Sequence, residues 1–251
     1  MNVMHEIERN DLLRELSEES RNRLLPHLSP VTLPAGHVLS GVRYSGAHVW
    51  FPTSSVVTLQ HVLKDSCSAQ FGIVGREGAV GLPALFSDRT CSDHAVVLQG
   101  GSALKISRLT LRSEFHRSQD LRDILMQYSW AMMQIAAQTV ACNTHHCLND
   151  RLCTWLLLVM DRMHGNHLSV TYEELANLLG VRREAVMQSA RRLQNAELIE
   201  HRRGCLSILD RQGLEASACE CYASARRTVS PTALHDTAHR RHEPVPMVAY
   251  R

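Results

Sequence analysis

The feature that most constrains the fold is a run without proline or glycine between residues 118 and 147. Within it, mostly apolar residues recur at alternating steps of four and three, namely Leu121, Leu125, Tyr128, Met132, Ile135, Thr139, Cys142 and His146. This spacing is typical of the seam of a coiled coil. It predicts one long helix over residues 117–147, whose seam from Leu121 to Thr139 pairs with the same helix of a second copy. A long helix packed only on its own chain is the alternative.

Most of the 13 glycines precede this run, between residues 36 and 101. They separate short segments rich in β-branched residues, such as HVWFPTSSVVTLQHVL and HAVVLQGGSALKI. Short strands divided by turn residues are typical of an antiparallel roll or jelly roll. Two short amphipathic helices, ended by Pro26 and Pro30, come before the strands. We therefore expect an α+β protein in which residues 1–116 form a β-roll sensor domain.

Residues 148–227 show the pattern of a winged helix-turn-helix domain. A helix is expected over 148–163, and Thr171 followed three residues later by Glu174 is a capping-box signature that opens the next helix. Gly180 ends that helix, and another begins near Arg182. A hairpin then turns at residues 202–204, and a last helix is expected over 211–226. Residues 228–251 lack periodicity, so we expect a disordered tail.

Positive charge is concentrated in the second half of this pattern. Between residues 180 and 204 there are six arginines and three glutamates, so the local charge of +3 exceeds the +2 of the whole chain. Arginine, glutamate and glutamine at the start of a recognition helix match guanine, cytosine and adenine, and further arginines suit phosphates. The residues predicted to contact double-stranded DNA are Arg182, Arg183, Glu184, Gln188, Arg191, Arg192, Arg202 and Arg203. A surface helix with solvated arginines is the alternative.

The order of β-roll, long helix and the segment TYEELANLLGVRREAVMQSARRLQNAELIEHRRGCLSILD resembles the Crp/Fnr superfamily of bacterial transcription regulators, over about residues 10–226. The positions that match that family's DNA-binding segment are Gly180, Arg183, Glu184, Val186 and Leu193. The resemblance implies a cyclic-nucleotide-binding-like roll, a homodimer on a palindromic site, and RNA polymerase as a further partner. It places Arg183 and Glu184 at base-reading positions, whereas Gln188 replaces an arginine often found there.

The turn GREGAVGLPALF departs from that family's cyclic-nucleotide binders. Val80 and Gly81 stand where a ribose-binding glutamate is sought, and Asp93 stands near the expected phosphate-binding arginine. An aspartate repels phosphate, so cyclic AMP binding in the usual way is disfavoured. A rearranged effector pocket would use Arg76, Glu77, Gly78, Gly81 and Arg89. The effector itself stays unknown, and a roll that only positions a partner surface is the alternative.

Composition indicates a soluble globular protein, with 44% hydrophobic and 21% charged residues. Residues 1–30 lack the apolar core of a secretory signal. The longest strongly apolar stretch, Trp155–Met160, is far shorter than the roughly 20 residues of a membrane span. We therefore expect a cytoplasmic protein without membrane contact, whose eight cysteines are reduced thiols.

The cysteines do not predict a metal site. Cys142 and His146 share a helix face, but Cys142 and Cys147 point about 140° apart on a continuous helix. Cys219 and Cys221, placed within the expected last helix, diverge by about 200°. We therefore expect no metal residues, and no cofactor is required by the sequence. Haem, an iron–sulfur cluster, a metal completed by the same pair of a second copy, and reversible thiol oxidation are left as alternatives.

No catalytic motif is found in the sequence. A nucleophile elbow, a phosphate loop and an H-E-x-x-H pair are all missing, so we do not expect an enzyme. The rival class is a ligand-, redox- or metal-sensing interaction module that does not bind DNA.

Overall fold

The structure is a computed structural model that describes residues 3–40, 46–64, 68–86, 93–163 and 165–229. It begins with short helices that cover one end of the roll: α1 (Val3–Ile7), α2 (Asp11–Glu15), α3 (Glu18–Leu24) and the 3-10 turn η1 (Leu25–His27). Asn10 caps α2 by accepting from the backbone N–H of Leu13, and its Nδ2 donates to the carbonyls of Pro52 and Gly78. One buried amide thus ties these helices to the roll.

Two antiparallel sheets form the roll. Their strands are β1 (Ser29–Leu33), β2 (Val38–Ser40), β3 (His48–Pro52), β4 (Val56–Val62), β5 (Ser68–Val74), β6 (Asp93–Gln99) and β7 (Gly101–Ser107), with α4 (Pro83–Phe86) between β5 and β6. One sheet has the order β1-β7-β3 and the other β2-β6-β4-β5. Alternate residues point inward, so Val49, Phe51, Leu104 and Ile106 are buried in the core. The predicted antiparallel roll is confirmed.

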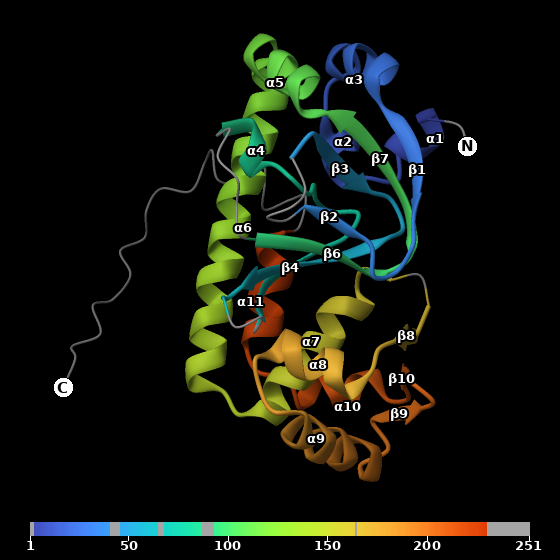
Figure 1. The fold of residues 1–251 in the computed structure, drawn as a ribbon, viewed down its shortest axis with the longest axis vertical. Helices are drawn as coiled ribbons and strands as arrows, with labels where there is room; N and C mark the ends of the chain where they lie inside the picture. The colour runs from blue at the N-terminus through green and yellow to red at the C-terminus, as the bar shows by residue number, and fades with distance from the viewer. Residues whose placement is uncertain (1–2, 41–45, 65–67, 87–92, 164, 230–251) are drawn as a thin grey trace, which may run out of the picture.

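Two helices follow the roll, α5 (Arg108–Arg117) and the long α6 (Gln119–His145). Ser118 separates them: its extended backbone interrupts the helix, and its side chain accepts from the N–H of Leu121 to cap α6. Figure 1 shows α6 running beside the roll and then beside the C-terminal helix α11 (Cys221–Thr228). The predicted long helix is therefore confirmed, with its start at residue 119.

The predicted dimer seam on α6 is wrong. Leu121, Leu125 and Tyr128 are each only 1% exposed, because they pack on the roll of their own chain beside Phe51 and Leu104. Of the other predicted seam residues, Ile135 is also buried, while Met132 and Thr139 are half-buried. Side chains enclosed within one subunit cannot pair with a second copy. The alternative, packing on its own chain, describes this face of the helix.

Two residues separate α6 from the C-terminal part. Its elements are α7 (Leu148–Met160), β8 (His167–Ser169), α8 (Tyr172–Leu179), α9 (Arg183–Asn195), β9 (Ile199–Arg202), β10 (Cys205–Ile208), α10 (Arg211–Ala216) and α11 (Cys221–Thr228). A three-stranded sheet of order β8-β10-β9 forms beside the helices. Leu152, Leu156, Leu175, Val186 and Leu206 are fully buried in the shared core. The winged helix-turn-helix is confirmed, with a third strand, β8, that was not predicted.

The expected single helix over 211–226 is wrong. The chain leaves the helix after Ala216, and the Ser217 hydroxyl donates to the carbonyl of Gly213, four residues earlier. A new helix starts at Cys221, so Cys219 lies in the connection between two helices. Of the predicted tail 228–251, Thr228 still ends α11, and residues 230–251 lie outside the described residues. Among the described helices, none is both long and apolar enough to span a membrane.

Candidate nucleic-acid interface

The helix-turn-helix is set by local signals at both ends of α8. The Thr171 hydroxyl accepts from the N–H of Glu174, and the Glu174 carboxylate accepts from the N–H of Thr171, which completes the predicted capping box. At the other end Gly180 adopts a left-handed conformation, φ 65°, that ends the helix without strain. Arg151 donates to the terminal carbonyl of Leu179. The turn that aims α9 is therefore fixed on both sides.

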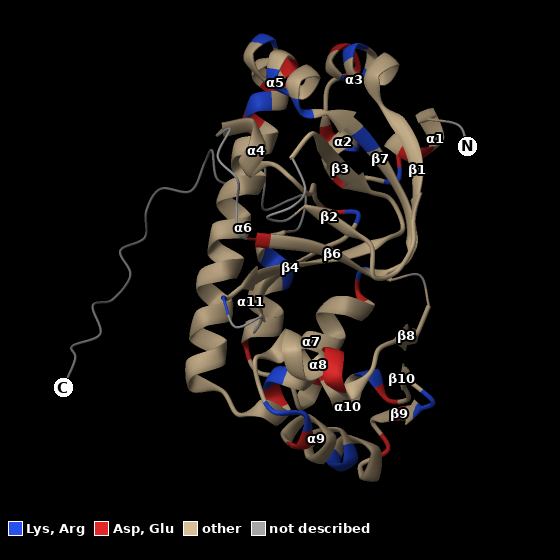
Figure 2. Cartoon of the chain, viewed as in Figure 1, with Lys and Arg blue, Asp and Glu red and all other residues tan. Residues whose placement is uncertain are grey.

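Helix α9 packs one face inward and leaves the other to solvent. Val186, Ala190 and Leu193 are buried against α7 and α8. Helix α9 lies at the end of the molecule far from the roll (Figure 1), and Figure 2 shows that several of its residues are charged. Of the residues predicted to contact DNA, those on or beside this helix are all exposed: Arg182, Arg183, Glu184, Gln188, Arg191 and Arg192. Their roles stay predictions.

The first turn of α9 has a distinct electrostatic character. Arg183 Nε lies 3.9 Å from Glu173 Oε2, and both side chains are more than half exposed, so the pair is weak and easily exchanged. Glu184 sits at the positive N-terminal end of the helix, which favours a carboxylate. Hydrogen-bond donors and acceptors are thus presented together where the helix begins.

The hairpin β9–β10 forms the wing. Its two-residue turn is Arg203–Gly204, with φ of 51° and 77°. Glycine adopts such angles freely, whereas arginine does so at a cost of about 1–2 kcal/mol. Arg202, next to the turn, has its Nε 2.7 Å from Glu200 Oε1 and is highly exposed. Both predicted wing arginines therefore stand at an exposed tip, and one of them occupies a strained position.

Those predicted effector residues that the structure describes pack against other parts of the chain. Arg76 lies on the surface with its Nε 3.7 Å from Asp11 Oδ2. A side chain on Gly78 would collide with Tyr128, since a Cβ there would overlap the tyrosine Oη. Gly81 has φ 94° and passes close to the backbone of His48. Arg89 lies outside the described residues.

Glu77 has a partner that the sequence analysis missed. Its Oε1 lies 2.5 Å from Arg162 Nε, and both side chains are nearly buried. Arg162 follows α7, so this ion pair joins the glycine-rich turn of the roll to the C-terminal domain. Gly75 leaves space for it, because a Cβ there would lie 2.9 Å from Arg162 Cβ and from Glu77 Oε2. Glu77 therefore acts within the chain; residue spacing carries no signal for a partner so distant in sequence.

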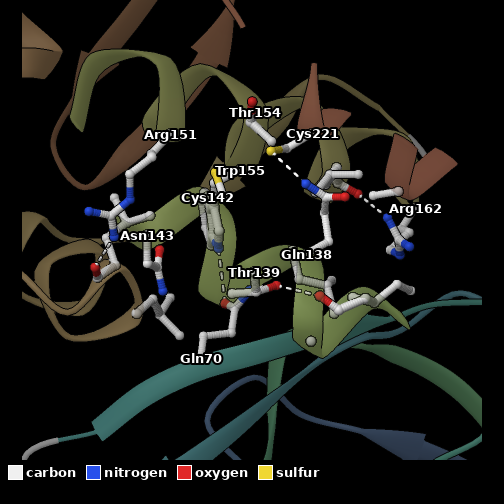
Figure 3. A pocket seen from close by; sticks show the side chains of 17 residues that line it. Gln70, Gln138, Thr139, Cys142, Asn143, Arg151, Thr154, Trp155, Arg162 and Cys221 are labelled. Carbon is white, nitrogen blue, oxygen red and sulfur yellow. Dashed lines mark hydrogen bonds between the residues drawn. The ribbon is translucent and has the colours of Figure 1, made fainter. Parts of the chain in front are cut away.

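Asp93 also has an internal partner, because its Oδ1 lies 2.6 Å from His61 Nδ1 across neighbouring strands. A cavity does open between the roll and the C-terminal helices, lined by residues of β5, α6, α7, α8 and α11 (Figure 3). Gln70 and Trp155 bridge its wall by a 2.9 Å hydrogen bond. Of the described residues proposed for the effector, none lines this cavity.

The six cysteines that the structure describes fall into two groups. Cys147 and Cys205 are exposed, whereas Cys153 is fully buried, and this burial raises the pKa of its thiol to about 12. A protonated buried thiol is a poor nucleophile. The second group is a cluster that sequence spacing did not predict: Cys142, His146, Cys219 and Cys221 have their ligand atoms within 4.8 Å of one another. The expected divergence of Cys219 and Cys221 assumed a continuous helix and is wrong, because Cys219 precedes α11.

The order of antiparallel roll, long helix and winged helix-turn-helix is similar to that of solved Crp/Fnr family regulators. In particular, residues 150–217 match the family model of the Crp-like helix-turn-helix domain. No curated protein matches the sequence significantly. The chain therefore has the Crp/Fnr fold and carries a Crp-like helix-turn-helix domain.

Solved structures agree with this fold. A CRP/FNR family transcriptional regulator from Thermus thermophilus is 21% identical, with a TM-score of 0.62 over 76% of this chain and 98% of that one. FixK2 from Bradyrhizobium japonicum is 14% identical, with a TM-score of 0.63 over 76% and 98% of the two chains. A CRP family regulator, also from Thermus thermophilus, is 15% identical, with a TM-score of 0.64 over 75% and 96%. At these identities the likeness is one of fold.

Proposed function

We propose that this chain is a sequence-specific DNA-binding transcription regulator that acts as a homodimer on a palindromic site. The observation that carries the proposal is the exposed outer face of α9, where Arg183, Glu184 and Gln188 stand together at the helix's leading turns. A recognition helix enters the major groove with these turns against the base edges. The match to a Crp-like helix-turn-helix domain supports the same function.

The exposed residues divide into two roles. Arg183, Glu184 and Gln188 carry the groups that discriminate bases, each good pair contributing about 1–3 kcal/mol. The other arginines of helix and wing neutralise phosphates and supply affinity that does not depend on sequence: Arg182, Arg191, Arg192, Arg202 and Arg203. The excess of positive charge in this segment is explained by these phosphate contacts.

The homodimer would form through the face of α6 that is opposite the roll. Met126, Trp130, Met133 and Val140 are between 55% and 67% exposed, and with Ala137 they recur at steps of four, three, four and three. Exposed apolar residues at this spacing form a coiled-coil seam, which a second α6 covers in register. We therefore propose that a second copy of this chain packs on this face. The two-fold axis of the resulting dimer would present two recognition helices to a symmetric DNA site.

The roll carries the sensing part of the proposed function. We propose that the roll does not bind cyclic AMP in the usual way, because Glu77 and Asp93 are both paired within the chain. The division into residues 1–116, 117–147 and 148–227 remains our proposed domain organisation. Contact with RNA polymerase and a cytoplasmic location are predictions that follow from a regulator of this type.

The test is selection of bound fragments from random double-stranded DNA, carried out at two salt concentrations. We expect enrichment of a two-fold symmetric site and an affinity that falls steeply with salt, since bound phosphates release counterions. A matched control is the variant with Arg183, Glu184 and Gln188 all changed to alanine, which keeps the fold because these side chains are exposed. If the native chain enriches no site, the protein is an interaction module and the proposal is wrong.

A further inference from the structure

Four potential metal ligands meet where the long helix ends. Cys142 and His146 come from the last turn and the C-cap of α6, Cys219 comes from the connection before α11, and Cys221 is the first residue of α11. The three cysteines are buried, with 3% to 9% of their surface exposed, and His146 is half-buried. Residues 75 or more positions apart in sequence are thus brought together within one chain.

The distances match the edges of a tetrahedron around one ion. Zinc lies about 2.3 Å from thiolate sulfur and about 2.0 Å from imidazole nitrogen, so neighbouring ligand atoms are roughly 3.8 Å (S–S) and roughly 3.5 Å (S–N) apart. Here Cys142 Sγ and Cys219 Sγ are 3.6 Å apart, and Cys221 Sγ and His146 Nδ1 are 3.4 Å apart. The whole set spans no more than 4.8 Å. An iron–sulfur cluster holds its ligands on different iron atoms and needs a wider set.

Side chains around the four ligands lie within hydrogen-bonding distance of them, as is typical of a metal site. His146 Nε2 lies 3.3 Å from Glu220 Oε1, so the carboxylate can accept the ring N–H while Nδ1 faces the cysteines. Gln138 Nε2 lies 2.9 Å from Cys221 Sγ and donates to it. The Thr154 hydroxyl lies 3.0 Å from Cys219 Sγ. Donors next to the sulfur atoms stabilise thiolates, which are the form that binds metal.

We propose that Cys142, His146, Cys219 and Cys221 bind one zinc ion in a closed tetrahedral site. On binding, the three thiols release their protons to solvent and no atom changes oxidation state. With four protein ligands the site has no open position, so its role is structural rather than catalytic. The ion joins α11 to the end of α6 across α7, at the joint where the long helix passes into the DNA-binding domain (Figure 1).

The first test measures metal in the untagged full chain after dialysis against a weak chelator. We expect about one zinc per chain and no iron or sulfide, as a closed four-ligand site implies. Replacing zinc with Co²⁺ should give absorption bands of tetrahedral cobalt bound to thiolate. Retention of no metal, or Co²⁺ spectra without thiolate bands, would overturn the proposal. So would iron with inorganic sulfide, or a native Cys142–Cys219 disulfide found by mass spectrometry.

Variants locate the site. Cys219→Ser and Cys142→Ser should lose the zinc, whereas Cys147→Ser should retain it, because Cys147 is exposed and outside the cluster. Glu220 is 80% exposed, so Glu220→Ala will fold; it should keep the metal but bind it about 10–100-fold more weakly, by loss of the partner of His146. Unchanged affinity in Glu220→Ala together with zinc retained in Cys219→Ser would place the metal elsewhere. These readouts do not depend on DNA binding, so they are independent of the proposed function.

Discussion

Arg162 Nε lies 2.5 Å from Glu77 Oε1, and this nearly buried ion pair connects the roll to the C-terminal domain. Arg162 also donates from Nη1 to the carbonyl of Leu158, and Glu77 accepts from the N–H of Gly75. Both charges are therefore paired and hydrogen-bonded, as burial requires. The glycine-rich turn of the roll is therefore joined to the C-terminal domain by this pair.

Removing one member of this pair should destabilise the protein strongly. Glu77→Gln leaves the Arg162 charge buried without its partner, and we expect a loss of about 3–5 kcal/mol in the free energy of unfolding, measured by urea denaturation. The double variant Glu77→Gln/Arg162→Met should cost less than the sum of the single changes. Arg76→Ala is the control, since that exposed neighbour should cost less than about 1 kcal/mol. Additive single effects would show that the two charges do not interact.

Substitutions on α9 should separate specificity from affinity. Arg183→Ala or Glu184→Ala removes base contacts, so we expect discrimination at one position of the site to fall by about 1–3 kcal/mol. Arg202→Ala removes a phosphate contact and should weaken binding to all sequences about equally. The measurement is affinity for a panel of single-base variants of the selected site. Lys64→Ala, which removes an exposed cation from the roll, is the control. If every variant instead lost affinity equally for all sequences of the panel, the base-reading roles would be contradicted.

The wing offers a substitution whose effects on stability and binding oppose one another. Arg203 has φ 51° at the first position of a two-residue hairpin turn before Gly204, where asparagine is favoured. Arg203→Asn should therefore leave stability unchanged or raise it by up to about 1 kcal/mol. It should also reduce the salt dependence of DNA binding by about one phosphate contact. Thermal unfolding and binding at several salt concentrations measure the two effects; an unchanged salt slope would exclude Arg203 from the interface.

The exposed stripe of α6 should control assembly. Trp130→Glu or Met133→Glu places a charge in the proposed seam, and we expect sedimentation equilibrium to show monomers with unchanged helix content. Leu109→Glu is the matched control, because Leu109 is as exposed as Met133 but lies on α5. Ile135→Glu, on the buried face, should instead destabilise the subunit. A Met133→Glu chain that still sediments as a dimer would exclude this face.

The sequence by itself determined the elements whose signals are local. The capping residue Thr171, the left-handed Gly180 and the glycine of the wing turn act within a few residues, so the helix-turn-helix and its exposed arginines could be located from spacing alone. The antiparallel roll followed in the same way from short strands and turn glycines. The long helix was predictable too, because nothing within residues 119–145 breaks it.

Tertiary structure alone decided which face of α6 packs against the roll and which residues its C-terminal end contacts. Helix α6 has two stripes with the same four-three spacing, and only contact with Phe51 and Leu104 shows that the Leu121–Leu125–Tyr128 stripe belongs inside. Glu77 and Arg162, like Cys142 and Cys219, are far apart in sequence and meet because the chain folds back on itself. Periodicity indicates which residues share a face of one helix or strand. Contacts between residues of different elements depend on how those elements pack.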